Sequence, residues 1–201
     1  MNQSEKQRGR SGHANEQPAG WALPEKTDID QEVFLHQVCQ QEFVQLLQQS
    51  WAKIDHCFSQ LNEAQIWWRP DVDLNSIGNL SLHLAGNLRQ WAVASLRGVP
   101  DERNRDAEFS ESTQVSKQDL HRLLLETIAD ATEVICGIRA DMWSRELSVQ
   151  GFRVNVYQAL QHTCAHFVGH THQIILLTRL QLGDRYRFHW TPDGPREVTP
   201  I

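Results

Sequence analysis

The sequence predicts an all-α protein, a four-helix bundle with a short β-hairpin between its third and fourth helices. Two observations support this fold class. Large apolar residues recur at alternating steps of three and four in several long segments, the pattern of a helix with one buried face. The chain also has no strand-rich region, so we expect the helices to bury their apolar faces against one another.

The first two helices are defined by their apolar positions and by the residues that interrupt them. The first is predicted from Asp30 to about Leu61. A break containing Pro70 follows, and Asn75 is the expected N-cap of the second helix, which ends at Gly98. The apolar positions are Val44, Leu47, Trp51, Ile54, Phe58 and Leu61 in the first helix, and Ile77, Leu80, Leu84, Leu88 and Trp91 in the second.

The last two helices flank the predicted hairpin. Ser116 and Asp119 resemble a capping box that starts the third helix. Residues 145–154 contain two short apolar runs around a Gln-Gly pair, which predicts the hairpin. Asn155 is the expected cap of a fourth helix that runs to about Leu182. The apolar positions of the third helix are Leu120, Leu124, Ile128, Ala131, Ile135 and Ile138.

These elements predict one folded domain with a tail at each end. Residues 1–20 are polar with almost no large apolar side chains, so we expect a disordered tail. The bundle domain is predicted over 21–183, and residues 184–201 form a C-terminal tail with two turn-rich clusters. The charged, turn-prone residues 101–115 are expected to form a connection on the surface.

Composition argues against several classes of partner. The chain has 19 Lys and Arg against 25 Asp and Glu, a net charge of −6, so a broad basic field for nucleic acid is not expected. No stretch reaches the ~20 apolar residues of a membrane helix, and the N-terminus lacks the apolar core of a signal peptide. We therefore expect a cytoplasmic protein with reduced cysteines. Long amphipathic helices favour a homodimer.

The fourth helix carries the densest chemical feature of the chain. At 100° per residue, His162, His166 and His170 lie along one stripe, whereas His172 faces away. Two histidines four residues apart can bind one divalent metal ion, and neutral imidazole suits zinc, nickel, iron and copper. His166 and His170 border the apolar face, but His162 is ~12 Å of helix rise from His170. The third ligand is therefore expected from another helix.

His83 is the natural third ligand, because it lies in the middle of the second helix beside the apolar line. It belongs to a polar stripe with Asn79 and Asn87 that could supply a ligand and the groups supporting it. Three histidine ligands would leave positions open for water or substrate, as in catalytic sites. Two alternatives remain open: a non-catalytic metal site, or histidines that only hydrogen-bond to one another.

Other reactive or aromatic residues have structural interpretations. Cys164 lies 200° around the helix from His166, which is a poor geometry for a catalytic pair, and a buried thiol is expected. Trp51 and Trp91 lie on apolar stripes and are predicted core residues. Trp67 and Trp68 are expected to anchor their loop to the bundle.

Two segments resemble signatures of the DinB-like superfamily of YfiT-type metal-dependent proteins. They are NSIGNLSLHLAGNLRQW at 75–91 and HFVGHTHQIILLTRL at 166–180, and WWRP at 67–70 also fits the approach to the first ligand helix. The resemblance covers about residues 30–182 and implies a four-helix bundle.

The resemblance implies a zinc or nickel site formed by His83, His166 and His170, the same three residues that the spacing favours. His172 stands where the family has a glycine before Gln173, so the close packing of a glycine is not expected there. His162 matches no ligand of the family pattern, and a supporting or bundle-edge role is expected.

The resemblance also implies a function. Some members of the superfamily resemble transferases in which a metal activates a low-molecular-weight thiol such as bacillithiol, mycothiol or glutathione. We therefore expect a metal-dependent thiol S-transferase acting on a small-molecule electrophile. A metal-dependent hydrolase is the alternative enzyme, although carboxylates that could serve as a general base are scarce near both motifs.

Overall fold

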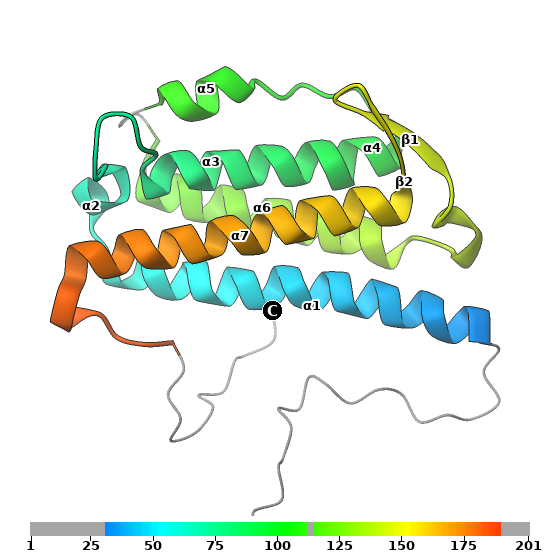
Figure 1. Cartoon of the computed structure of the whole chain (residues 1–201), viewed down its shortest axis with the longest axis horizontal. Helices are drawn as coiled ribbons and strands as arrows, with labels where there is room; N and C mark the ends of the chain where they lie inside the picture. The colour runs from blue at the N-terminus through cyan, green and yellow to red at the C-terminus, as the bar shows by residue number, and fades with distance from the viewer. Residues whose placement is uncertain (1–30, 112–114, 190–201) are drawn as a thin grey trace, which may run out of the picture.

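Long helices packed side by side form the body of the protein (Figure 1). The computed structural model describes residues 31–111 and 115–189, so the predicted tail at 1–20 and the end of the chain from 190 lie outside the described residues. Two of the long helices, α1 and α7, contact each other, and each contacts one of the other two, which confirms the predicted four-helix bundle. The long helices are α1 (Gln31–Gln60), α3 (Ile77–Leu88), α6 (Lys117–Cys136) and α7 (Val156–Leu182).

The long helices run in two pairs of opposite direction. Lys117 at the start of α6 donates from Nζ to the carbonyl of Leu61 (2.7 Å), so α6 begins where α1 ends. Gln181 near the end of α7 donates to the carbonyl of Gln65, so α7 ends at that same end of the bundle. Helices α1 and α7 therefore point one way and α3 and α6 the other (Figure 1). The chain between α3 and α6 must return along the whole bundle.

The core lies between the long helices and is filled by the predicted apolar positions. Trp51 and Trp91 are buried, as predicted. Trp67 is buried and its Nε1–H donates to the carbonyl of Val115 (3.1 Å), which fixes the loop before α3 against the start of α6. Trp68 is partly exposed. The largest fully buried side chains are Phe58, Phe167, Leu47, Ile54, Ile66, Ile77, Leu84, Leu88, Leu120, Leu124, Ile135 and Leu160.

The second long helix begins one residue later than predicted. Ser76, not Asn75, is the N-cap: its Oγ accepts from the backbone N–H of Asn79, whose Oδ1 accepts from the backbone N–H of Ser76. This exchange satisfies the first backbone donors of the helix. The helix continues through a π-helical segment, η1 (Arg89–Ala94), and α4 (Ser95–Arg97), to the predicted stop at Gly98, which has φ 68°.

Two short helices lie in segments that lack a helical apolar pattern. Helix α2 (Glu63–Trp67) follows an Asn62 cap, and α5 (Arg105–Ser110) follows an Asn104 cap. Helix α5 lies against α3 and belongs to the returning connection (Figure 1). The expectation of a mere surface connection over 101–115 is thus incomplete, because a short helix gives too few turns for a periodic signal.

The predicted hairpin is present between α6 and α7. Strands β1 (Glu146–Val149) and β2 (Phe152–Asn155) pair antiparallel, with Val149 opposite Phe152. The turn residues Gln150 and Gly151 both have positive φ, 53° and 80°, as a two-residue turn between twisted strands requires. Short 3₁₀ turns, η2 (Ala140–Met142) and η3 (Gly183–Arg185), precede the hairpin and follow α7.

Within residues 31–111 and 115–189, none of the helices combines the length and apolar content needed to span a bilayer.

We expect opposite effects on stability from alanine at two helical glycines. A Cβ at Gly78 would lie 2.7 Å from ring carbons of Trp67, whereas one at Gly169 would meet nothing within 4 Å. Gly78→Ala should therefore lower the free energy of unfolding by about 1–3 kcal/mol through overpacking. Gly169→Ala should raise it by roughly 0.5–1 kcal/mol through helix propensity. Urea unfolding of both variants measures this, and an equal shift in the two would contradict the close packing at Gly78.

Candidate metal centre

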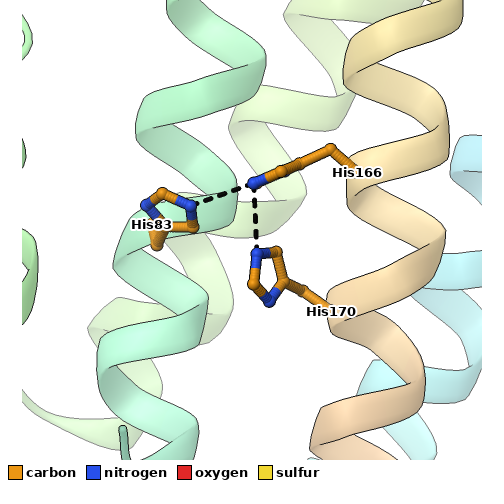
Figure 2. Close-up of side chains that lie close together, drawn as sticks. All are labelled: His83, His166 and His170. Carbon is orange, nitrogen blue, oxygen red and sulfur yellow. Dashed lines mark hydrogen bonds between the residues drawn. The ribbon is translucent and has the colours of Figure 1, made fainter.

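The structure brings the three predicted ligands together between α3 and α7 (Figure 2). His83 Nε2 lies 3.0 Å from His166 Nε2, and His170 Nε2 lies 3.1 Å from the same atom. One nitrogen of each ring falls within 4.8 Å of both others. This three-histidine cluster could hold a metal ion. Two adjacent turns of α7 and the middle of α3 form it, as the spacing predicted.

The other two histidines of α7 lie outside the cluster. His162 is exposed, and its ring stacks on His166 with centroids 6.1 Å apart and contacts Trp91 at 4.2 Å. His172 is also exposed. These positions agree with the bundle-edge role expected for His162 and with the outward direction expected for His172.

Hydrogen bonds to the far side of two rings orient their Nε2 atoms toward the cluster. His83 Nδ1 lies 2.9 Å from Glu108 Oε2, and His170 Nδ1 lies 2.7 Å from Gln173 Oε1. An oxygen acceptor faces each Nδ1, and Arg103 Nη2, which also approaches His83 Nδ1, donates to Glu108, so we assign the ring protons to Nδ1. The lone pairs of both Nε2 atoms then face His166. This is the tautomer that a metal-binding histidine requires when it binds through Nε2.

A buried ion pair supports His83 from behind. Glu108 is 7% exposed, and Arg103 donates to its two oxygens from Nε (2.7 Å) and Nη2 (2.8 Å). Arg103 Nη2 is also 3.0 Å from His83 Nδ1. Burial raises the pKa of Glu108, but the hydrogen bonds from Arg103 and His83 outweigh it and lower the pKa below its usual value. The carboxylate is therefore ionised and accepts from His83.

Glu108 and Arg103 are the residues that sequence reasoning missed. Both belong to the connection expected at the surface, and Glu108 is a carboxylate close to the first motif, contrary to the expected scarcity. One local signal exists in Gly86, three residues after His83. A Cβ there would overlap Glu108 Oε1 and lie 2.9 Å from Arg103 Nε, so the glycine makes room for the ion pair.

The amides of the predicted polar stripe hold the backbone around the site and do not belong to the cluster. Buried Asn79 donates from Nδ2 to the carbonyls of Glu108 (3.0 Å) and Glu111 (2.7 Å), which fixes α5 against α3. Asn87 Oδ1 accepts from Thr163 Oγ1 (2.8 Å) and links α3 to α7. The stripe therefore supplies one candidate ligand, His83, and two structural groups.

Burial keeps the two α7 histidines of the cluster, His166 and His170, neutral. Burial together with the neighbouring His170 and His83 lowers the pKa of His166 to about 3. Burial also lowers the pKa of His170 below its usual value, with a smaller opposing effect of the hydrogen bond to Gln173. Both rings are therefore uncharged near neutral pH, and a neutral ring has a lone pair available for a metal.

The donor set fits a divalent transition metal. Three nitrogens bound at 2.0–2.1 Å to a tetrahedral ion would be about 3.3 Å apart, close to the two Nε2 separations of 3.0 and 3.1 Å. Without a cation, His83 and His170 both direct lone pairs at His166, which can donate to only one of them from Nε2. A cation between the three Nε2 atoms removes this mismatch.

The π-helical segment η1 connects the site to the hairpin. It places Gln90 so that its Oε1 accepts from Arg103 Nη1 (2.8 Å) and from the Gln150 side chain at the hairpin turn. Gln90 also donates to Asp101. Short π-helical segments often occur at functional sites because they re-aim side chains within a helix. Here the segment joins the hairpin turn to the ion pair behind His83.

Two of the cysteines, Cys57 and Cys164, are buried and unreactive at neutral pH. Cys164 is buried, and burial raises the pKa of its thiol to about 12. Burial also raises the pKa of Cys57. Neither forms a thiolate at neutral pH, which confirms the structural interpretation of Cys164.

Solved structures share this fold. A conserved protein from Enterococcus faecalis superposes with a TM-score of 0.62 at 18% identity, covering 71% of this chain and 96% of the other. A DinB-like protein, YjoA, from Bacillus subtilis superposes with a TM-score of 0.54 at 14% identity, covering 70% and 92% of the two chains. These likenesses show that the chain shares its four-helix-bundle fold with both proteins.

A family model gives the more particular assignment. The model described as "Protein of unknown function (DUF1572)" matches residues 31–194, and the chain belongs to that family. No curated protein matches the chain.

We expect metal content to depend on the cluster and not on the neighbouring histidines. Untagged wild-type protein should contain about one equivalent of metal by elemental mass spectrometry, because three imidazole ligands suffice to hold a divalent ion. His83→Ala and His166→Ala should lose it. His162→Ala and His172→Ala should retain it, and loss of metal in either control would contradict the assignment of the ligands.

Glu108→Gln should weaken metal binding about 10- to 100-fold, because the charged acceptor that orients His83 is lost. Competition with a chromophoric chelator measures the affinity, and circular dichroism verifies that the variant is folded. Glu133→Gln is the matched control, since Glu133 pairs with Arg97 at the surface. Equal affinities of the two variants would show that Glu108 does not support the site.

Proposed function

We propose that the protein is a metal-dependent transferase that activates a low-molecular-weight thiol toward a small electrophile. The thiol is of the bacillithiol, mycothiol or glutathione type, and the metal is zinc or nickel. The observation that carries this proposal is the incomplete donor set. Among residues 31–111 and 115–189, the cluster contains three histidines and no fourth His, Cys, Asp or Glu. Three neutral ligands leave room for a substrate atom.

A divalent ion bound by the three imidazoles would act as a Lewis acid and lower the pKa of a thiol that binds beside them. In the overall reaction the thiol loses its proton to solvent and its sulfur forms a bond to carbon of the electrophile. The leaving group departs with the electron pair of the broken bond. We place this reaction in the cytoplasm, where such thiols are kept reduced.

Side chains next to the cluster orient two of its imidazole rings. Glu108 fixes the His83 ring, and Gln173 fixes the His170 ring, so both Nε2 atoms keep one direction while a ligand exchanges. Arg103 balances the charge of Glu108 behind the His83 ring. These groups position the site and do not touch the reacting atoms.

The position of Glu108 supports thiol transfer over hydrolysis. A water-activating hydrolase needs a base within reach of the water. Both oxygens of Glu108 accept hydrogen bonds from Arg103, and one also accepts from His83 Nδ1, on the opposite side of the ring from the cluster. This carboxylate is therefore not placed to take a proton from a water bound at Nε2.

We expect zinc- or nickel-loaded protein to join bacillithiol, mycothiol or glutathione to monobromobimane faster than the uncatalysed reaction. Fluorescence of the conjugate measures the rate. His166→Ala, which removes the central imidazole, should lower the rate to background, and His172→Ala should keep it.

Two other outcomes would assign a different function. Cleavage of an ester without any thiol would favour the metal-dependent hydrolase. A metal-loaded protein with neither activity, whose ion is closed by a fourth protein ligand, would favour a non-catalytic metal-binding protein. The homodimer expected from the long helices stays a prediction.

A further inference from the structure

A buried glutamine stands at the centre of the hydrogen bonds behind the three-histidine cluster. Gln90 is 9% exposed, and its side chain bonds to three other side chains. Its Oε1 accepts from Arg103 Nη1 (2.8 Å) and from Gln150 Nε2. Its Nε2 donates to Asp101. Gln90 therefore joins three parts of the chain: the helix that carries His83, the connection after it, and the hairpin turn.

The helix binds the buried ion pair at two places. His83 contacts the carboxylate of Glu108, and Gln90, seven residues or about two helical turns further on, contacts the guanidinium of Arg103. The first contact orients a candidate metal ligand. The second contact holds the cation that neutralises and orients the carboxylate.

Arg103 needs the acceptor that Gln90 provides. The Arg103 side chain is 4% exposed, and its Nε and Nη2 donate to the two oxygens of Glu108. The third nitrogen, Nη1, donates to Gln90. A buried donor without a partner is costly, so loss of the Gln90 oxygen would favour a shift of the guanidinium toward another acceptor. Such a shift would disturb the two bonds that fix Glu108, and Glu108 fixes His83.

The hairpin turn carries a conformational cost at the residue that reaches Gln90. Among residues 31–111 and 115–189, Gln150 is the only non-glycine residue with a positive φ, 53°. Asn, Asp or Gly is preferred in such a turn, because these residues adopt positive φ more readily. Glutamine has the longer side chain, and it donates to Gln90. The strained backbone at this position points to a role of the contact beyond closing the hairpin.

We propose that Gln90 is a positioning residue of the metal centre. It holds Arg103 on Glu108, and this pair keeps His83 Nε2 directed at the ion. Gln150 ties the hairpin turn to the same support, so the affinity for metal depends on the turn as well as on the ligands. The inference rests on the metal binding in the proposed function and does not depend on thiol transfer.

Removal of the amide of Gln90 tests its role directly. Gln90→Leu should weaken zinc binding about threefold to tenfold, less than the loss of a group that contacts a ligand. Competition with a chromophoric chelator measures the affinity. The visible spectrum of the cobalt-loaded variant should also differ from wild type, because the His83 ring changes its direction at the ion. Gln181→Leu removes a glutamine bond to the carbonyl of Gln65 and should keep both readouts.

An exchange of two side chains should rescue the site. In Gln90→Glu combined with Asp101→Asn, the net charge is unchanged and the hydrogen bond between the two positions is reversed. The carboxylate at position 90 can still accept from Arg103 and Gln150. This double variant should bind zinc as tightly as wild type. Gln90→Leu combined with Glu108→Gln should bind no more weakly than Glu108→Gln alone, because Gln90 acts through that carboxylate.

Gln150→Asn separates metal binding from the stability of the turn. Asparagine adopts a positive φ more readily but is too short to keep the bond to Gln90. The urea midpoint of the metal-free variant should therefore stay at or above that of wild type. Its zinc affinity should nevertheless fall, by less than in Gln90→Leu. A glutamine that only closes the hairpin would not give this combination.

The outcomes distinguish this inference from the proposed function. Unchanged zinc affinity and cobalt spectrum in Gln90→Leu would overturn the inference and leave the function standing. Weaker binding that the exchanged pair fails to restore would also overturn it. Weaker binding that the exchanged pair restores, in a protein that conjugates no thiol, would support the inference and overturn thiol transfer. A wild-type protein that binds neither zinc nor cobalt would overturn both.

Discussion

The arrangement around the candidate site depends on the buried pair of Glu108 and Arg103. A carboxylate removed from water is tolerated only when opposite charge and hydrogen-bond donors surround it. Arg103 supplies both, and His83 supplies a further donor. The pair in turn needs the space that Gly86 leaves on α3. Burial of the Glu108 charge, the absence of a side chain at Gly86 and the orientation of the His83 ring therefore depend on one another.

The direction of the helices explains why this pair comes from a connection. Helices α3 and α6 run the same way, so the chain between them must travel back along the outside of α3. Where this connection packs against the bundle, its buried backbone polar groups are cut off from water and need partners in the protein. Asn79 is such a partner and donates to carbonyls at the end of α5. The same contact places Glu108 behind His83.

The bundle and the three histidines could be predicted from the spacing of residues along the helices. His166 and His170 lie one turn apart on the same helix, and His83 lies beside the apolar positions that pack its helix against the others. Glu108 and Arg103 could not be predicted in this way, since their approach to His83 depends on a path that no local periodicity describes. Asn75 and Ser76 are both favourable N-cap residues, so the sequence did not distinguish between them, and the structure shows that Ser76 is the cap. The π-helical segment at Gln90 interrupts the ordinary helical period, so its contacts with Arg103 and Gln150 were not visible from spacing.

The location of the cluster at mid-helix has an electrical consequence. The partial charges of a helix act within its first and last turns, and His83, His166 and His170 lie away from the termini of α3 and α7. The field at the cluster is thus set by side chains, where the charges of Glu108 and Arg103 offset each other. A divalent cation held there by three neutral imidazoles would keep a net positive charge, so anions would be attracted more strongly than neutral molecules of the same shape.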